Sequence, residues 1–241
     1  MKVDSITDIG LVRAQNEDDV KTGLLEDAAW AVVCDGMGGA NAGEVASQNG
    51  VQVISDGIRK NYYTGANDKV ISYVLRTAVS DANTVIFNLS EAYEHLSGMG
   101  TTAVAAIVAH GVGYICHVGD SRAYLIREDS IRCITKDHSV VQQLIDAGTL
   151  TEAEAKVHPQ RNIITRCLGV HPHVETDSNE VSLESGDMLL LCTDGLTNYL
   201  TEDEILEFSK RLDPSALIRA LVEEAKQRGG SDNITAAVIE N

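Results

Sequence analysis

The clearest helical periodicity in the chain lies between Asn67 and Leu96. Apolar residues recur there every three or four positions and form one broad stripe: Val70, Ile71, Val74, Leu75, Ala78, Val79, Ala82, Val85, Ile86 and Leu89. This spacing predicts an amphipathic helix with one buried face. A preceding helix is expected from Ala42 to about Lys60. Two more are predicted near the C-terminus, in "TEDEILEFSKRL" and "DPSALIRALVEEAKQR", which open with a Thr cap and with Asp-Pro.

Strand-like patterns occupy other parts of the chain. Four runs follow one another with short breaks and predict an antiparallel meander: "TTAVAAIVA", "GYICHV", "RAYLIR" and "IRCIT". Three others are apolar on consecutive positions, so both faces of each strand are expected to be covered: "AAWAVVC", "DMLLLCT" and "NITAAVIE". Strands grouped together with helices grouped around them predict an α+β layered domain rather than a βαβ repeat. No linker or repeat divides residues 1–241, so a single domain is expected.

The charge balance limits the possible partners. Lys and Arg total 19 against 36 Asp and Glu, giving a formal net charge of −17. Such a surface repels polyphosphate backbones, so a general nucleic-acid binder is not expected. Any site for an anionic substrate must therefore contain local cations.

Cysteine spacing and the N-terminal segment bear on the compartment. The five cysteines show no paired spacing, which argues against a disulfide framework and indicates a reducing environment. The opening "MKVDSITDIG" lacks the apolar region of a secretory signal, and no run has membrane-spanning length. We therefore expect a cytoplasmic protein without membrane association.

Acidic residues gather at the ends of the predicted strands, most of them beside glycine. They are Glu17, Asp18, Asp35, Asp120, Asp194 and Asp232. Each of them alone is explained equally well as a turn or strand-boundary residue. If they converge, their repulsion requires cations, and an all-oxygen ligand set favours magnesium or manganese over zinc. Two such ions roughly 3.5–4 Å apart can clamp a phosphoryl group and activate a water.

The segment "WAVVCDGMGGANAGEVAS" does not match the GxGxxG pattern of a dinucleotide-binding turn. Together with other blocks, it resembles the type-2C family of metal-dependent protein serine/threonine phosphatases, in its compact bacterial form. Eight blocks occur in the family's order: "SITDIGLVRAQNEDD", "VVCDGMGGANAGEVAS", "GMGTTAVAAIV", "CHVGDSRAYLIR", "ITKDHSVVQQLIDAG", "HPQRNIITRCLG", "GDMLLLCTDGLTNYL" and "GGSDNITAAVIE". The resemblance implies a four-layer α-β-β-α sandwich with two central antiparallel sheets flanked by helices. It also implies a flap subdomain at about 136–170.

The resemblance further implies roles for individual residues. Asp35 would bridge two Mn²⁺ or Mg²⁺ ions, and the Gly36 carbonyl would ligate one of them. Other members of the site are implied as follows: Asp194 and Asp232 as ligands, Glu17 and Asp18 as acceptors from metal-bound waters, Asp120 with Asp194 as a weaker third metal site, and Arg13 as the phosphate-binding catalytic residue with Asp35. The planar guanidinium fork suits the binding of two phosphate oxygens at once.

The implied reaction is hydrolysis of phosphoserine and phosphothreonine in proteins by a metal-activated water, without a covalent intermediate. No cysteine has the Cys-x5-Arg setting of a thiol phosphatase. The expected partners are phosphorylated proteins in signalling, with a bacterial serine/threonine kinase opposing the enzyme, and a monomer is expected. Two alternatives stay open: a hydrolase of small phosphomonoesters or diesters, and a catalytically weak phosphoprotein-binding regulator.

One position departs from the family pattern. Ala40 stands where family members usually carry a His that is a candidate for protonating the leaving alkoxide. Loss of a general acid can cost about 10²–10⁴-fold in rate. A metal-bound water is the preferred replacement, and His138 and Asn41 are the alternatives.

Overall fold

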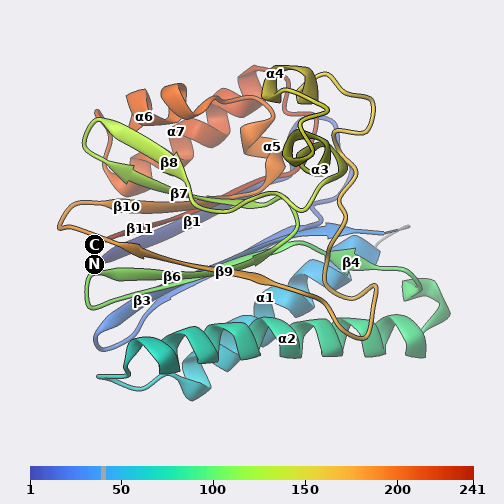
Figure 1. Cartoon of the computed structure of the whole chain (residues 1–241), viewed down its shortest axis with the longest axis horizontal. Helices are drawn as coiled ribbons and strands as arrows, with labels where there is room; N and C mark the ends of the chain where they lie inside the picture. The colour runs from blue at the N-terminus through green and yellow to red at the C-terminus, as the bar shows by residue number, and fades with distance from the viewer. Residues whose placement is uncertain (39–41) are drawn as a thin grey trace.

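The computed structural model describes residues 1–38 and 42–241, and these form four layers (Figure 1). Two antiparallel sheets face each other in the centre. One is covered on its outer face by α1 (Ala42–Asn61) and α2 (Asp68–Ala92), and the other by the C-terminal helices. The α-β-β-α sandwich expected from the sequence is confirmed.

The sheet under α1 and α2 has six strands. Five of them lie in the order β2 (Asp18–Leu24), β3 (Ala28–Met37), β5 (Ala103–Ala109), β6 (Val112–Val118) and β9 (Asp177–Ser182), and β4 (Gly100–Thr101) pairs with β3. The register of β2 against β3 places Asp18 directly opposite Asp35. Directly opposed residues of an antiparallel pair project from the same face of the sheet, so two acidic side chains meet there.

The second sheet has five strands, and its composition corrects the predicted meander. Its order is β1 (Lys2–Asp8), β11 (Ile234–Glu240), β10 (Met188–Cys192), β7 (Arg122–Arg127) and β8 (Ser130–Cys133). The chain crosses from one sheet to the other between β6 and β7, so the predicted meander is two hairpins in different sheets. Period-2 apolar alternation reports that a strand has a buried face but not which sheet it joins. The crossing passes through Gly119, whose φ of +102° suits glycine.

The helices follow the predicted boundaries closely. Asn67 caps α2 by accepting from the Val70 amide, and a short 3₁₀ turn at Glu94–Leu96 follows that helix. The remaining helices are α3 (Val140–Asp146), α4 (Glu152–Ala155), α5 (Asp194–Thr197), α6 (Glu202–Ser209) and α7 (Pro214–Gln227). Thr201 forms a capping box at the start of α6, as its position before an acidic turn predicts.

Three apolar layers fill the spaces between helices and sheets. Strand β3 contributes to two of them, because Trp30 and Val32 face α1 and α2 while Ala31 and Val33 face the second sheet. Every residue of β5 is buried. The prediction that the consecutively apolar strands are covered on both faces is confirmed, because β3, β10 and β11 are buried over nearly their whole length. The five cysteines are free, and three of them are buried in these layers.

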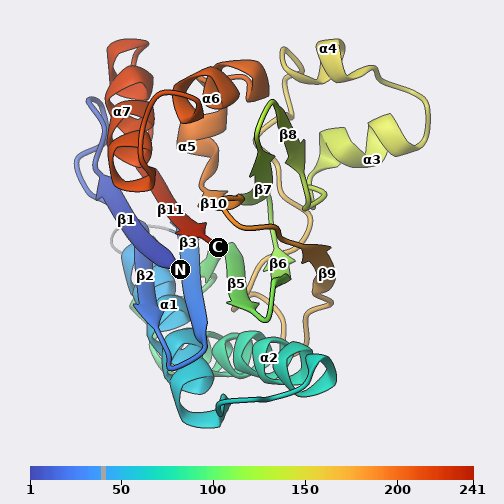
Figure 2. The same ribbon diagram turned by 90° about the vertical axis from the view of Figure 1, so that its left-hand side faces the viewer.

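The long connection between β8 and β9 carries α3 and α4, which project from the edge of the layered body (Figure 2). The two ends of the chain lie side by side, because β1 pairs with β11 and Lys2 is opposite Glu240. Among the described residues, no helix has the combined length and apolar character that crossing a bilayer requires.

Candidate metal centre

The acidic residues selected from the sequence meet where strands of both sheets end. Asp35 lies near the end of β3, and Asp18 begins β2 beside it. In the other sheet, Asp194 begins α5 just after β10, and Asp232 lies two residues before β11. Asp120 occupies the connection between β6 and β7. Residues separated by up to 214 positions therefore form one cluster of carboxylates.

The pKa shifts of these carboxyl groups show that they act on one another. Burial raises the pKa of Asp35 well above its ordinary value, and repulsion from the other four aspartates of the cluster adds to this shift. Burial likewise raises the pKa of Asp18 to about 7, with Asp194 and Asp232 contributing. The pKa of Asp120 is raised to about 7 by burial and by Asp194. Without cations, the folded chain therefore favours protons on groups that are normally ionised at neutral pH.

Two threonines hold Asp18 and join it to the second sheet. The Thr193 hydroxyl donates to Asp18 Oδ2 at 2.9 Å. Thr193 Oγ1 also accepts from the Thr235 amide, and the Thr193 amide donates to the Thr235 carbonyl, both at 3.1 Å. Asp18 is only 6% exposed, so these bonds take the place of water around its carboxylate.

Another pair of threonines fixes the backbone of Asp35. The Asp35 amide donates to Thr102 Oγ1 at 3.0 Å, and the Asp35 carbonyl accepts from the Thr102 amide at 2.8 Å. Thr101 Oγ1 donates to the same carbonyl at 2.9 Å. These bonds use main-chain atoms of Asp35 and so leave its carboxylate for a ligand. The Thr102 hydroxyl also contacts Ser121 Oγ at 2.7 Å, which links this corner to the Asp120 connection.

Gly36 is required by close packing. Its amide donates to the Glu17 carbonyl at 3.0 Å, and a Cβ atom at this position would overlap the carbonyl oxygens of Gly43 and Glu17. Glycine at this position therefore permits the close approach of three backbone segments beside Asp35.

Arg13 lies at the rim of the cluster, on the loop between β1 and β2. Its Nη2 atom is 2.9 Å from Asp232 Oδ2, and its Nη1 atom is 3.9 Å from Glu17 Oε2. The Arg13 side chain is 48% exposed, so it can reach both the carboxylates and solvent. The neighbouring Arg122 is committed elsewhere, because it binds both oxygens of Asp137 at 2.9 and 2.7 Å.

The donor set fits a hard divalent cation. Carboxylate oxygens, with the Gly36 carbonyl beside them, are the ligands that magnesium and manganese prefer. The raised pKa values show that the folded cluster lacks enough positive charge of its own. Divalent ions bound between Asp35, Asp194 and Asp232 would supply it.

His138, one of the alternative proton donors, is held by neighbouring groups within the fold. His138 is 6% exposed; its Nδ1 accepts from the Gly119 amide at 3.2 Å and its Nε2 lies 3.4 Å from Asp177 Oδ2. Both ring nitrogens are engaged, which argues against His138 as a proton donor. Ser139 caps α3, since Ser139 Oγ accepts from the Gln142 amide at 3.2 Å. Ala40 and Asn41 lie outside the described residues.

A second polar cluster lies at the base of the long β8–β9 connection. The rings of His117 and His138 have centroids 4.8 Å apart, and both lie within 4.8 Å of an Asp177 oxygen. Arg166 Nη1 is 3.0 Å from Asp177 Oδ1 and 3.3 Å from His138 Nε2. A guanidinium therefore already supplies the positive charge at this cluster.

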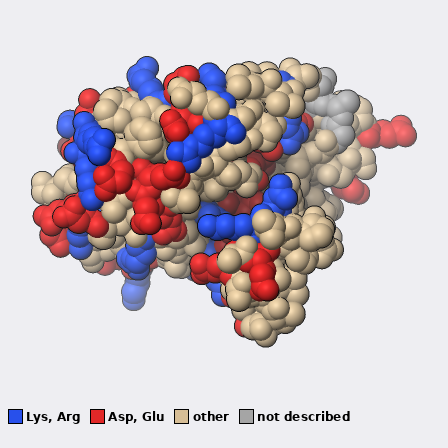
Figure 3. Space-filling view, turned by 90° about the horizontal axis from the view of Figure 1, so that it is seen from above, with Lys and Arg blue, Asp and Glu red and all other residues tan. Residues whose placement is uncertain are grey.

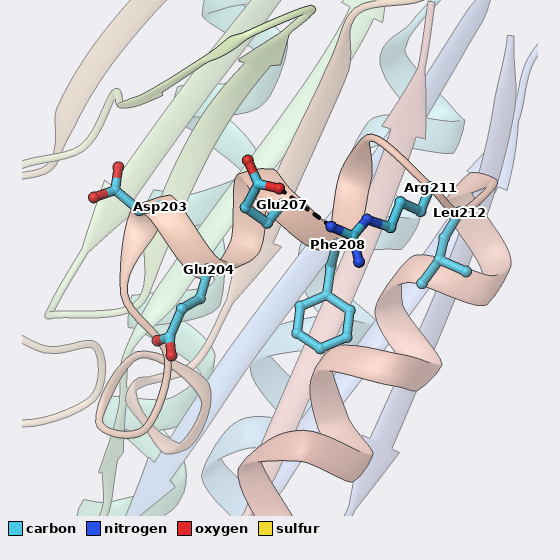
Figure 4. A pocket seen from close by; sticks show the side chains of 6 residues that line it. All are labelled: Asp203, Glu204, Glu207, Phe208, Arg211 and Leu212. Atoms are coloured by element: carbon cyan, nitrogen blue, oxygen red, sulfur yellow. Dashed lines mark ion pairs between the residues drawn. The ribbon is translucent and has the colours of Figure 1, made fainter.

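The surface beyond the cluster is mixed in charge and includes one apolar hollow. Figure 3 shows Lys and Arg interspersed with Asp and Glu over the described part of one face, rather than gathered into a basic surface. A cavity of about 400 Å³ lies at α6, with Phe208 and Leu212 in its wall and the Glu207–Arg211 ion pair, at 3.6 Å, beside it (Figure 4). None of the predicted site residues lines this cavity.

Comparison with known proteins points to one family. Residues 12–228 match the family model described as Protein phosphatase 2C. The serine/threonine phosphatase stp of Listeria innocua is 38% identical over 240 residues, which cover 97% of this chain and 93% of that protein. The solved structure of serine/threonine phosphatase Stp1 from Staphylococcus aureus superposes with a TM-score of 0.92 at 34% identity, covering 100% of this chain and 94% of the other. The catalytic domain of PstP in complex with two manganese ions superposes with a TM-score of 0.88 at 35% identity, covering 99% and 97%.

Proposed function

The chain belongs to the protein phosphatase 2C family, and we propose that its cluster of aspartates holds the ions with which it hydrolyses phosphoserine and phosphothreonine. The activity is that of a metal-dependent serine/threonine protein phosphatase. The observation that carries the assignment of the site is the convergence of Asp18, Asp35, Asp120, Asp194 and Asp232, with raised pKa values at the four aspartates whose shift is resolved.

Each acidic residue has a distinct place in the proposed site. Asp35 is central, because all the other aspartates of the cluster repel it, and so it suits a bridging position between two ions. Asp194 and Asp232, with the Gly36 carbonyl, complete the direct ligands. Asp18 is already tied by Thr193, which suits it to accept hydrogen bonds from bound water. Asp120 with Asp194 is the proposed third, weaker site.

Bound between these carboxylates, divalent ions would supply Lewis acidity and an activated water. The chain itself orients the phosphate. Arg13 projects from an exposed loop beside Asp232, and its fork can bind two phosphate oxygens and absorb charge that develops in the transition state. Without Arg13, the negative charge of the cluster would repel a phosphate. Arg13 therefore also determines where the phosphate can approach.

The leaving alkoxide requires a proton. The residue at position 40 is Ala, whose side chain has no proton to donate. The two ring nitrogens of His138 already contact Gly119 and Asp177. We assign this proton to a water molecule held beside Asp120 and Asp194. Such a water would lie in the same cluster as the proposed ligands and needs no additional side chain.

Further features of the proposal extend beyond the cluster. Residues 136–170, which include α3 and α4, are proposed as a flap that contacts the protein substrate. The proposed setting is cytoplasmic signalling, in which a bacterial serine/threonine kinase phosphorylates the substrates and this chain acts as a monomer. The acidic net charge of −17 supports a preference for protein substrates over nucleic acid.

The test is phosphate release with manganese present or removed by a chelator, measured on a phosphothreonine peptide, a nucleoside monophosphate and a phosphodiester. Manganese-dependent turnover of the peptide in preference to the other two is expected. Preferential turnover of the small substrates would favour the small-ester hydrolase. Peptide binding without turnover would favour a phosphoprotein-binding regulator. The Ala40→His variant, assayed in parallel, measures whether a side-chain acid adds to the rate; an unchanged rate is expected if water already supplies the proton.

A further inference from the structure

Asn233 is a buried neutral residue beside the carboxylate cluster. It is 4% exposed and follows Asp232 directly. Its Nδ2 atom donates to the Ile9 carbonyl at 3.0 Å and to the Gln15 carbonyl at 2.9 Å. Its Oδ1 atom accepts from the Glu17 amide at 2.8 Å. One side chain thus makes three hydrogen bonds to the main chain of a single loop.

This loop connects β1 to β2 and carries Arg13. The residues at 11–15 are all exposed, and the loop has no regular secondary structure. Two further main-chain bonds hold it from outside, from the Leu11 amide to the Gly230 carbonyl at 2.7 Å and from the Gly36 amide to the Glu17 carbonyl at 3.0 Å. Asn233 binds both limbs, because Ile9 precedes Arg13 while Gln15 and Glu17 follow it. The position of the Arg13 backbone therefore depends strongly on this one amide.

The chemistry of an amide suits this position. Its two N–H groups each bind one carbonyl, and its oxygen binds one N–H, so a carboxylate of the same shape would lose both donors. A carboxylate would also add a negative charge beside Asp232, where the cluster already raises the pKa values of its members. An aliphatic side chain would remove all three of these bonds and leave the main-chain groups of the loop without this partner.

We propose that Asn233 is a positioning residue that holds the 9–17 loop, and through it Arg13, in place to bind the phosphate. The inference rests on the phosphate-binding role proposed for Arg13. Asn233 itself touches neither phosphate nor metal in this scheme. Its effect on the reaction is transmitted through the loop, where a displacement of about 1 Å can cost as much as 10²-fold in rate.

The chain offers a matched control in Asn83. This residue is 2% exposed, and its Nδ2 donates to the His171 and Pro172 carbonyls at 3.0 and 3.2 Å. Its Oδ1 accepts from the Gly169 amide at 2.9 Å. Asn83 therefore makes the same three kinds of bond to a different loop. Replacing either residue by Ala removes equivalent interactions, but only Asn233 holds the loop of Arg13.

The experiment compares Asn233→Ala, Asn83→Ala and wild type in the full chain at saturating manganese. We expect Asn233→Ala to raise KM for a phosphothreonine peptide, and Ki for inorganic phosphate, by roughly 10- to 100-fold. Manganese affinity measured by calorimetry should stay within about threefold of wild type. This is well below the roughly 10- to 100-fold loss of affinity that is typical when a hydrogen-bond partner of a metal ligand is removed. Asn83→Ala should lower the urea midpoint to a similar extent and leave Ki for inorganic phosphate, which does not reach the proposed flap, within about twofold of wild type.

A double-mutant cycle separates positioning from general damage. If Asn233 acts through Arg13, Asn233→Ala should change KM and Ki by less than about twofold in an Arg13→Ala background. An equal change in both backgrounds, or a matching loss of manganese affinity, would overturn the proposal. Should Asn233→Ala not fold, Asn233→Asp keeps the volume and the acceptor for Glu17 while losing both donors, and the same KM increase is expected. Wild-type turnover tests the phosphatase activity separately, so unchanged kinetics in the variants would reject only the role of Asn233.

Discussion

Arg13 Nη2 lies 2.9 Å from Asp232 Oδ2, so the proposed phosphate-binding cation rests on a proposed metal ligand. A guanidinium beside Asp232 partly compensates the negative charge of the cluster. When divalent ions neutralise the carboxylates instead, the attraction between Asp232 and the exposed guanidinium of Arg13 becomes weaker. Arg13 is then available to bind an anion. Metal and phosphate binding are therefore linked through this pair.

Removing the cation tests this linkage. Arg13→Ala should raise KM for a phosphothreonine peptide by about 10- to 100-fold, because hydrogen bonds to charged groups are worth about 1.5–3 kcal/mol. Manganese affinity should not fall, since Asp232 loses only a competing cation. Arg13→Lys should recover part of the loss, because an ammonium keeps the charge but not the bidentate fork. Steady-state kinetics and calorimetry measure both quantities, and an unchanged KM would remove Arg13 from the site.

Each of the other four aspartates of the cluster repels Asp35, and Asp35→Asn removes that charge. Manganese-dependent activity should fall by more than the 10- to 100-fold typical of losing a partner of a metal ligand. The metal-free protein should become more stable at pH 8, because one of the mutually repelling charges is gone. Urea denaturation and phosphate release check the two effects. Asp129→Asn is the control, since its side chain is 90% exposed, and activity retained in Asp35→Asn would contradict the ligand assignment.

The raised pKa values predict how pH acts on the metal-free protein. Asp18 and Asp120 have a pKa of about 7 in the folded chain, against 3.8 ordinarily, so the folded state binds more protons than the unfolded state between these values. The free energy of unfolding should therefore fall as pH rises through this range. Burial lowers the pKa of His117 and of His138, which opposes the trend below about pH 6.5.

The window from about pH 7 to 8 isolates the carboxylates, because the two histidines, whose ordinary pKa of 6.5 is lowered in the folded state, are then mostly neutral in both states. Urea denaturation in the presence of a chelator should show falling stability across this window. Manganese should stabilise the protein more at pH 8 than at pH 6, since protons compete for the same oxygens. A manganese effect that does not vary with pH would contradict the cluster as the binding site.

Thr193 connects Asp18 to the second sheet, and Thr193→Val removes the hydroxyl with little change of shape. The Asp18 carboxylate then loses a donor while buried, which should destabilise the protein by about 1–3 kcal/mol at pH 8 in the presence of manganese. Thr84→Val is the control, because Thr84 is exposed on α2 and bonds only within its helix, where effects stay within about 0.5 kcal/mol. Equal effects of the two variants in urea denaturation would show that the Thr193–Asp18 bond contributes nothing.

Much of the secondary structure follows directly from local patterns. The apolar stripe in 67–96 has the period of a helix, and α2 occupies Asp68–Ala92 within it. Thr201 and Asp213 cap α6 and α7 as their positions before acidic and Pro-containing turns predict. These features depend on neighbours within a few residues, so a linear pattern contains the information. The sheet to which each strand belongs is different, and β6 and β7 join different sheets although they are separated by only three residues.

The residues of the candidate site also fall into those that a local sequence pattern reveals and those that it does not. Asp35, Asp194 and Asp232 could be selected from the sequence because acidic residues beside glycine at strand ends form a repeated pattern and because the blocks around them resemble a family. Asn233 and Thr193 were not selected, since a single amide or hydroxyl has no distinctive spacing. Only the Asp-Asn pair before the last strand hinted at Asn233, and it is equally common in turns.

The sequence alone determined the types of element, the charge and the proposed set of oxygen ligands, because these depend on residues and on their near neighbours along the chain. The tertiary structure decided which sheet each strand joins, that Arg13 rests on Asp232, and that Asn233 holds the 9–17 loop that carries Arg13. The last two relationships join residues more than 200 positions apart. They exist only once both sheets have packed together, since burial then requires each polar group to find a partner within the fold.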